Sequence, residues 1–232
     1  MNTWTTLSRA VTASGDEIWL RQRDDIYEIR FNGIELMSSF NHQSEDQLAL
    51  RVMRELDYAP RRILIGGLGL GYTLRAVLEL AHADAEVHVC ELIPEIAAWN
   101  REYFGHLAGY PLQDPRCHLH VEDVQHHLAA APGFYDLILL DTDNGPDFII
   151  RTDNEELYRK SGIGAVIAAL RPAGIACFWS ATASAAFEAR LSGSMLPWRR
   201  DDIALLPGRV DAMHHIYLLG REGIGLRLRQ AA

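Results

Sequence analysis

The chain has few cysteines and no long apolar segment. Its 232 residues contain three cysteines, Cys90, Cys117 and Cys177, which lie far apart in apolar stretches. Because no Cys-x-x-Cys pair is present, we expect reduced, buried thiols in a cytoplasmic protein rather than a disulfide framework. No apolar run approaches the roughly 20 residues of a membrane span, and the first residues lack the features of a signal peptide. We therefore expect no membrane association.

Positive charge is also scarce. The formal net charge is −9, and Lys160 is the single lysine. A nucleic-acid partner requires a basic face, which the short pairs Arg61-Arg62 and Arg199-Arg200 do not supply. The sequence therefore predicts no nucleic-acid binding. Its length corresponds to one sizeable domain with room for a small appendage.

The stretch Ile63–Arg75, ILIGGLGLGYTLR, organises the rest of the chain. Its first three residues predict a buried parallel strand, and Tyr72–Leu80 has apolar residues at helical spacing. A strand, a glycine loop and a helix let a ligand approach bare backbone at a helix N-terminus. The glycines of this loop are Gly66, Gly67, Gly69 and Gly71.

The glycine spacing distinguishes between ligands. The dinucleotide pattern G-x-G-x-x-G is absent, which disfavours an NAD-type oxidoreductase. Gly67, Gly69 and Gly71 instead form G-x-G-x-G, which is typical of loops that bind S-adenosylmethionine-type nucleosides. A tight turn in another α/β protein is the alternative interpretation.

Two acidic residues follow the next predicted strands. Glu91 ends the segment Val87–Cys90, twenty positions after Gly71, where a carboxylate can accept hydrogen bonds from both ribose hydroxyls. Asp123 follows the strand that ends at Glu122 and can accept from an adenine amine, while Val124 donates its backbone N–H. The alternative for Asp123 is a plain helix cap.

The N-terminal segment predicts a small antiparallel module. Residues Glu17–Ser38 show strand alternation, and Asn32-Gly33 is a strong hairpin signal. Ser44 is then expected to cap a helix, with Gln47 completing a capping box, and this helix ends before Pro60. We expect a β-hairpin module over residues 1–43 and a nucleoside-binding domain over residues 44–232.

Strands and helices alternate through the remainder of the chain. This order predicts an α/β fold with a mostly parallel sheet, right-handed crossovers and a ligand site beyond the carboxyl ends of the strands. Strands are expected at Glu86–Glu91, Cys117–Val121, Tyr135–Asp141 and Gly174–Ser180, with a closing antiparallel pair at Ile203–Leu206 and His214–Leu219. Helices are expected from Pro94 and over Val124–Ala130, Gly162–Leu170 and Ser184–Leu191.

These motifs together resemble the spermidine synthase family of aminopropyltransferases. The resemblance extends from the Asn32-Gly33 hairpin through Glu91-Leu92-Ile93-Pro94 to the segment YDLILLD, which ends at Asp141. It implies a Rossmann-like class I methyltransferase fold with a seven-stranded sheet. It also implies transfer of an aminopropyl group from decarboxylated S-adenosylmethionine to a small amine. Glu91 would then bind the ribose, Asp123 with Val124 would bind the adenine, and Leu92 would belong to the same donor site. Asp141 would be the catalytic aspartate. A homodimer is also expected.

The chain departs from the family pattern at the amine-binding end. In alignment, Leu70 replaces the aspartate that faces the donor's amine tail in the family loop GGGDGG. Asn144 replaces the second acid, with Asp143 one position short of it, and residues 41–45 replace the segment that holds the acceptor. S-adenosylmethionine and its decarboxylated form therefore both stay candidate donors. Methyl transfer is the alternative reaction, and a non-catalytic nucleoside-binding protein is a further possibility.

The expected chemistry is alkylation of an amine, with no metal. Asp141 can orient a neutral amine and take its proton, and Asp143, Asn144 and Glu45 are candidate substrate ligands. Glu45 has capping its helix as the alternative role. The acidic loop from Asp141 suits a cationic substrate, although a solvated loop is the alternative. Asp143, Asp147 and Asp153 belong to this loop.

The histidines and tryptophans receive structural interpretations. The histidines form no metal-binding spacing and are expected on the surface or at sheet edges. Trp99, Trp179 and Trp198 are expected in the core or in a pocket wall.

Overall fold

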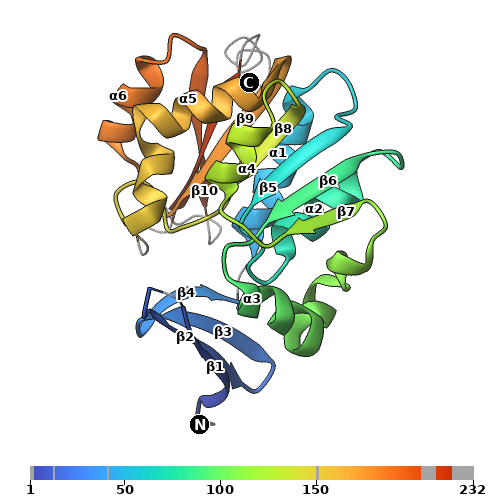
Figure 1. Ribbon diagram of the computed structural model, residues 1–232, viewed down its shortest axis with the longest axis vertical. Helices are drawn as coiled ribbons and strands as arrows, with labels where there is room; N and C mark the ends of the chain where they lie inside the picture. Colours follow the sequence, from blue (N-terminus) through green and yellow to red (C-terminus); the bar gives the residue numbers. More distant parts are fainter. Residues whose placement is uncertain (1–2, 13, 41, 150–151, 205–212, 221–232) are drawn as a thin grey trace.

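Two β-sheets make up the framework of the protein. The computed structural model describes residues 3–12, 14–40, 42–149, 152–204 and 213–220 (Figure 1). A small antiparallel sheet at the N-terminus lies beside one end of a larger, mostly parallel sheet (Figure 1). Among the described residues, no helix is both long and apolar enough to cross a lipid bilayer.

The small sheet has four strands in sequential order, β1-β2-β3-β4. The predicted hairpin at Asn32-Gly33 is confirmed, because both turn residues have positive φ, 48° and 80°. The first strand was not predicted, since its threonine, serine and arginine side chains hide the apolar alternation. The strands are β1 (Thr5–Val11), β2 (Glu17–Arg23), β3 (Ile26–Phe31) and β4 (Ile34–Ser38).

Helix α1 (Gln43–Glu55) connects the two sheets and ends before Pro60, as predicted. The predicted capping role of Ser44 is wrong. The helix begins one residue before Ser44, and its N-cap, His42, makes no side-chain capping bond. Ser44 lies inside the first turn with its side chain buried. Its hydroxyl donates to Glu45 Oε2 at 2.6 Å and caps no backbone N–H of the described residues.

The larger sheet has seven strands in the order β10-β11-β9-β8-β5-β6-β7, which confirms the predicted fold class. All neighbouring pairs are parallel except those made by β11, which runs antiparallel to β9 and β10. Of the predicted strand Ile203–Leu206, the last two residues lie outside the described part. The strands are β5 (Arg62–Gly66), β6 (Glu86–Cys90), β7 (Cys117–His120), β8 (Tyr135–Leu140), β9 (Leu170–Ser180), β10 (Trp198–Ala204) and β11 (Met213–Gly220).

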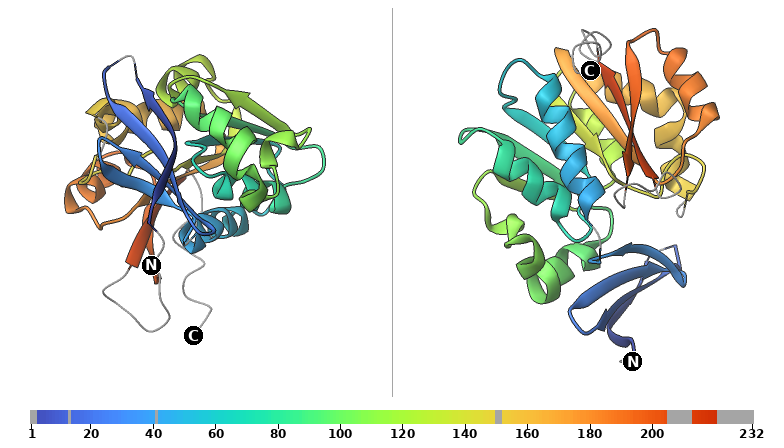
Figure 2. Two further views of the ribbon diagram at one scale, coloured as in Figure 1. Left: turned by 90° about the horizontal axis from the view of Figure 1, so that it is seen from below. Right: turned by 180° about the vertical axis from the view of Figure 1, so that it is seen from behind.

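Helices cover both faces of this sheet (Figure 2). Helices α1 and α2 (Tyr72–Leu80) lie on one face, and α4 (Val124–Ala130), α5 (Lys160–Ala169) and α6 (Ala185–Ser192) lie on the other. Because both faces are covered, every residue of β8 is buried.

A hydrophobic cluster joins the small sheet to α3 and to the π-helical turn that follows it. Helix α3 (Pro94–Trp99) begins at Pro94, as predicted, and continues into a π-helical turn, Asn100–Phe104. Trp99 and Phe104 pack there against Ile18 and Ile29 of the small sheet. The 3₁₀ turns Gly105–Ala108, Pro111–Gln113 and Thr152–Tyr158 complete the described helices. The division of the chain after residue 43 stays a prediction.

Candidate active site

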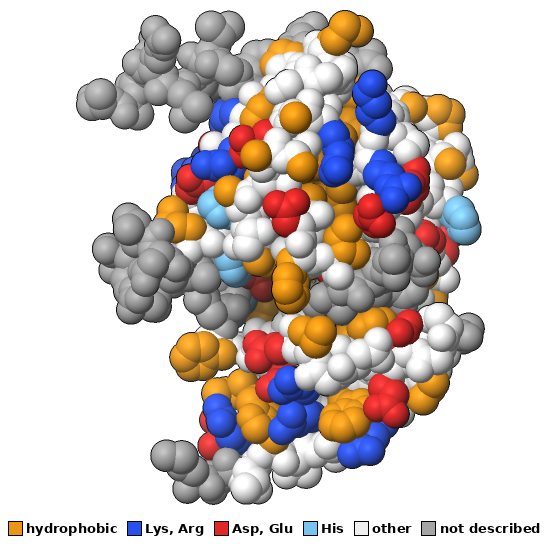
Figure 3. Space-filling view, turned by 90° about the vertical axis from the view of Figure 1, so that its left-hand side faces the viewer, with side chains coloured by type: hydrophobic (Ala, Val, Ile, Leu, Met, Phe, Trp, Pro, Cys, Tyr) orange, Lys and Arg blue, Asp and Glu red, His pale blue; other side chains and the backbone are white. Residues whose placement is uncertain are grey.

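A cavity of about 410 Å³ lies where the small sheet meets the carboxyl ends of β5, β6 and β8. Figure 3 shows hydrophobic and acidic side chains gathered along this junction. Strand β5 has β6 on one side and β8 on the other, so the cavity is at the topological switch point of the sheet. Its volume is typical of a small-molecule site.

The glycine loop forms one wall of the cavity. Gly67 and Gly69 line it, whereas Gly66 and Gly71 do not. Gly67 has a φ of +94°, and a Cβ there would lie 2.1 Å from the carbonyl oxygen of Asp141. Gly71 is the left-handed N-cap of α2, with a φ of 88°. Gly66 and Gly71 therefore shape the loop, while Gly67 and Gly69 face the ligand space.

Glu91 lies at the end of β6 with its side chain buried against the loop. Its carboxylate accepts hydrogen bonds from the backbone N–H of Leu68 at 3.1 Å and of Ile93 at 2.9 Å. Both Glu91 and Leu92 line the cavity. The carboxylate therefore also holds the glycine loop in place, and its predicted contact with a ribose stays a prediction.

Asp123 has the capping role that was the alternative prediction, and it also reaches the cavity. It is the N-cap of α4, and Oδ1 accepts from the Gln125 N–H at 2.8 Å. Both Asp123 and Val124 line the cavity. The two roles are compatible, since one carboxylate oxygen serves the cap.

Asp141 follows β8 and lines the same cavity as Glu91. Its N–H donates to the Gly66 carbonyl at 2.8 Å, and Oδ2 accepts from the Thr73 hydroxyl at 2.9 Å. Burial raises the pKa of Asp141 to about 7, with a further rise from the charge of Glu45 and a partial offset from Thr73. The group can therefore gain or lose a proton near neutral pH.

Glu45 reaches the cavity from the first turn of α1. Burial raises the pKa of Glu45, and the hydrogen bond from Ser44 opposes that rise. Asp141 and Glu45 thus each disfavour the charged form of the other. A cation placed between them would favour both charges, so this end of the cavity suits a protonated or developing ammonium group.

The loop after Asp141 is braced by its own side chains. Asp143 is buried, and its carboxylate accepts from the Asn144 N–H at 2.8 Å and from Asn154 Nδ2 at 2.9 Å. Asp143 and Asn144 both line the cavity. Asp147 does not line it, and its Oδ1 accepts a hydrogen bond from the Ser184 hydroxyl at 2.7 Å. The side chain of Asp153 lies outside the described part. The acidic loop is therefore only partly directed at the cavity.

Leu70 does not lie where the family alignment suggests. Its side chain is fully buried against the small sheet, among residues such as Ile18 and Tyr72, and it does not line the cavity. Leu68 and Gly69 face the cavity instead. No acid from the glycine loop therefore reaches the cavity.

Several wall residues escaped the sequence analysis. Met37 and Phe40 come from the small sheet and the residues after it, and His214 comes from β11. Trp179 lies in the cavity wall, one of its two predicted positions, and packs edge-on against His214 with ring centroids 4.6 Å apart. Burial lowers the pKa of His214 to about 4, so this ring is neutral at pH 7. Trp99 is in the core, the other predicted position.

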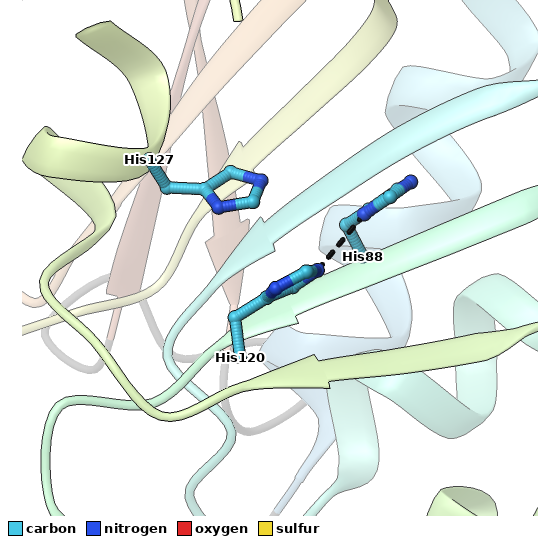
Figure 4. A group of neighbouring side chains, drawn as sticks. All are labelled: His88, His120 and His127. Atoms are coloured by element: carbon cyan, nitrogen blue, oxygen red, sulfur yellow. Dashed lines mark hydrogen bonds between the residues drawn. The ribbon is translucent and has the colours of Figure 1, made fainter. Parts of the chain in front are cut away.

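Three histidines form a group that sequence spacing did not reveal. His88, His120 and His127 gather on the side of the sheet covered by α4 (Figure 4), and His127 lies near Cys90 and Glu122, which line the cavity. Their separation in sequence hides a contact that the register of β6 and β7 creates.

Comparison with known proteins gives consistent results. A model of the spermine/spermidine synthase domain matches residues 46–191. The chain is 34% identical over 120 residues to polyamine aminopropyltransferase 2 of Pseudomonas aeruginosa, a match that covers 50% of this chain and 32% of that protein. It is 31% identical over 121 residues to putrescine N-methyltransferase 1 of Nicotiana tabacum, with 51% of this chain and 30% of that protein covered. The matches thus span about a third of each relative's length.

Solved structures agree on the fold. A spermidine synthase in complex with the transition-state analogue AdoDATO superposes with a TM-score of 0.75 at 17% identity, covering 94% of this chain and 72% of that chain. The spermidine synthase of Thermotoga maritima gives a TM-score of 0.74 at 17% identity, with 94% and 73% covered.

Proposed function

Because the chain belongs to the spermine/spermidine synthase family, we propose that it is a transferase that alkylates a small amine from an S-adenosylmethionine-type donor. One observation carries this proposal: Glu91 and Asp141 line a single cavity at the switch point of the sheet. The donor's ribose lies at Glu91 and its adenine at Asp123 and Val124. Its sulfonium end is directed at Asp141.

The reaction needs alignment and proton removal rather than activation of the donor. The sulfonium carbon is already electrophilic, so the protein holds the amine nitrogen in line with the breaking carbon–sulfur bond. The amine attacks in its neutral form, the carbon–sulfur electron pair stays on sulfur, and the ammonium product passes a proton to Asp141. A carboxylate with a pKa of about 7 can accept that proton near neutral pH. Glu45 and Asp143 favour the positive charge that develops on nitrogen.

Aminopropyl transfer from decarboxylated S-adenosylmethionine is the reaction we favour, on the family match. Methyl transfer from S-adenosylmethionine is the second candidate, and two observations favour it. Leu70 is buried in the core, so the glycine loop brings no acid to repel a donor carboxylate. The chain is also similar to putrescine N-methyltransferases over half of its length.

Calorimetry with each donor and mass analysis of the product test these alternatives. Binding of the decarboxylated donor, with an aminopropyl group added to an amine such as putrescine, supports the favoured reaction. Tight binding of S-adenosylmethionine alone, with a methyl group added, supports the second candidate. If the protein binds a nucleoside but wild-type and Asp141→Asn proteins both lack turnover with a panel of amines, the non-catalytic alternative replaces the transferase proposal.

We also propose a cytoplasmic homodimer. The free thiols of Cys90, Cys117 and Cys177 fit a reducing compartment. The small sheet exposes Val11 and Ile34, which a second copy could cover. Light scattering on the purified protein tests the assembly, and a monomer over the micromolar range would contradict it.

A further inference from the structure

The three-histidine group combines side chains from three elements (Figure 4). His88 belongs to β6, His120 to the neighbouring strand β7, and His127 to α4, which packs over these strands. The parallel register pairs Cys90 with His120 and His88 with His118. His88 and His120 therefore project from adjacent strands on the same side of the sheet, and His127 approaches them from the helix above.

Their nitrogen atoms converge. One nitrogen of each ring lies within 4.8 Å of the chosen nitrogens of the other two. His88 Nδ1 and His120 Nε2 are 3.0 Å apart. Two imidazoles bound at about 2.0–2.1 Å to one tetrahedral ion have nitrogens roughly 3.3 Å apart. The His88–His120 pair thus already has a spacing close to that of two ligands, and a nitrogen of His127 lies within 4.8 Å of both.

His127 carries the kind of partner that orients a metal-binding imidazole. Its Nδ1 lies 2.8 Å from Glu122 Oε1, and its Nε2 lies 2.6 Å from the Tyr135 hydroxyl. A carboxylate on one imidazole nitrogen fixes the ring and increases the basicity of the other nitrogen. Cys90 and Glu122 also form an overlapping group of possible ligands with His127. Further donor atoms are therefore at hand.

The rings can be reached from solvent. The side chains of His88, His120 and His127 are 16%, 31% and 14% exposed, which leaves a route for an ion from solvent. One ring is the N–H donor of the His88–His120 hydrogen bond. When that ring moves its proton to its other nitrogen, both facing nitrogens can bind the ion, and no net proton is released.

We propose that His88, His120 and His127 form a binding site for one divalent transition-metal ion of the zinc class, with Glu122 positioning His127. The ligand set is all imidazole, which suits Zn²⁺, Co²⁺ or Ni²⁺ rather than Mg²⁺ or Ca²⁺. The ion would tie the start of α4 to the β6–β7 edge of the sheet, beside the wall of the proposed nucleoside site. This proposal replaces the expectation of surface or edge histidines without a metal, and it does not depend on the transferase reaction.

The test uses untagged, metal-stripped full-length protein and the metal alone. Co²⁺ titration is expected to give visible absorption bands that saturate at one ion per chain, and Zn²⁺ is expected to displace Co²⁺. His88→Asn, His120→Asn and His127→Asn should each abolish the saturable signal. Glu122→Gln should weaken binding about 10- to 100-fold as a positioning change. His82→Asn is the matched control, since His82 lies outside the group and should retain wild-type binding.

Thermal melts in chelator check that each variant is folded. The titration of wild-type protein is decisive without any variant, because the absence of saturable Co²⁺ absorption bands would overturn the proposal. Equal loss of binding in His82→Asn, or full binding in His120→Asn, also overturns it. A rise in melting temperature with Zn²⁺ that is absent in His120→Asn supports it.

Discussion

The hydroxyl of Thr73 donates a 2.9 Å hydrogen bond to Oδ2 of Asp141 and so joins the first turn of α2 to the end of β8. This bond favours the charged carboxylate, while burial and Glu45 favour the neutral acid. The balance gives Asp141 a pKa of about 7. Helix α2, which begins directly after the glycine loop, thus helps to set the pKa of Asp141.

Replacing Thr73 with valine should move the pH dependence of the reaction upward. Thr73→Val keeps the shape of the buried side chain but removes the donor, so the pKa of Asp141 rises above its wild-type value. We expect the midpoint of kcat/KM against pH to shift up by about half a unit to one unit, and activity at pH 7 to fall several-fold. A pH–rate profile at low amine concentration measures this.

Replacing Glu45 with glutamine should have the opposite effect on that midpoint. The charge of Glu45 raises the pKa of Asp141, so Glu45→Gln lowers it. The same profile should therefore shift downward, even if KM for a cationic amine increases. Shifts in one direction for both variants would contradict the assignment of the midpoint to Asp141.

Asp141→Asn should separate activity from stability. As the proposed base, Asp141 contributes on the order of 10²- to 10⁴-fold to turnover, and the amide removes that contribution. In the folded protein the pKa of Asp141 is about 7, well above the ordinary value of 3.8 for an aspartate. Wild-type stability from this group is therefore full below about pH 4 and is lost as the pH rises through 7.

Asp141→Asn has no carboxyl group to ionise at this position, so its free energy of unfolding does not fall in this way as the pH rises through 7. We expect Asp141→Asn to be more stable than wild type at pH 8, by on the order of 1–3 kcal/mol, and this difference to vanish near pH 4. Urea unfolding at both pH values measures the two free energies of unfolding. A variant that is equally destabilised at both would show that Asp141 is not held near a neutral pKa.

The amino-acid pattern predicted the fold more fully than it predicted the site. Alternating apolar strands and helices, together with the Asn32-Gly33 turn, were sufficient for the layered architecture, because local spacing determines which face is buried. The strand Thr5–Val11 was missed because its polar residues occupy a partly exposed sheet. Glu91, Asp123 and Asp141 could be found since parallel strands bring their carboxyl ends to one edge.

Side-chain direction in the glycine loop and contacts across strands were beyond the sequence. Leu70 turns into the core because left-handed glycines on either side, Gly69 and Gly71, set the path of the loop. His88 and His120 meet only through the β6–β7 register, although they are 32 positions apart. A linear motif search cannot detect either feature.

Glu91→Gln should weaken nucleoside binding more than its small change in shape suggests. The carboxylate accepts from the N–H groups of Leu68 and Ile93, and the amide would present its NH₂ to one of these donors. We expect the affinity for S-adenosylhomocysteine or methylthioadenosine to fall about 10- to 100-fold, since a charged hydrogen bond contributes roughly 1.5–3 kcal/mol. Glu79→Gln, on the exposed side of α2, is the calorimetric control. Unchanged affinity in Glu91→Gln would remove Glu91 from the binding site.

Gly67→Ala should be strongly destabilising, and Gly133→Ala provides the comparison. Both glycines have positive φ, +94° and +62°, so each alanine incurs a cost of about 1–2 kcal/mol for the left-handed backbone. At Gly133 nothing lies within 4 Å of the new Cβ, whereas at Gly67 it would meet the Asp141 carbonyl oxygen at 2.1 Å. The excess loss in Gly67→Ala therefore reports the close approach of the glycine loop to Asp141.

Urea unfolding of the two variants measures that excess directly. We expect Gly133→Ala to keep wild-type nucleoside binding and turnover, because its loop lies away from the cavity lining. Gly67→Ala should lose both, since relieving the contact displaces either the loop or the Asp141 backbone. Equal stability losses in the two variants would mean that the loop can move away from Asp141 at no cost. The close contact between Gly67 and Asp141 would then not hold the glycine loop and the proposed base in a fixed arrangement.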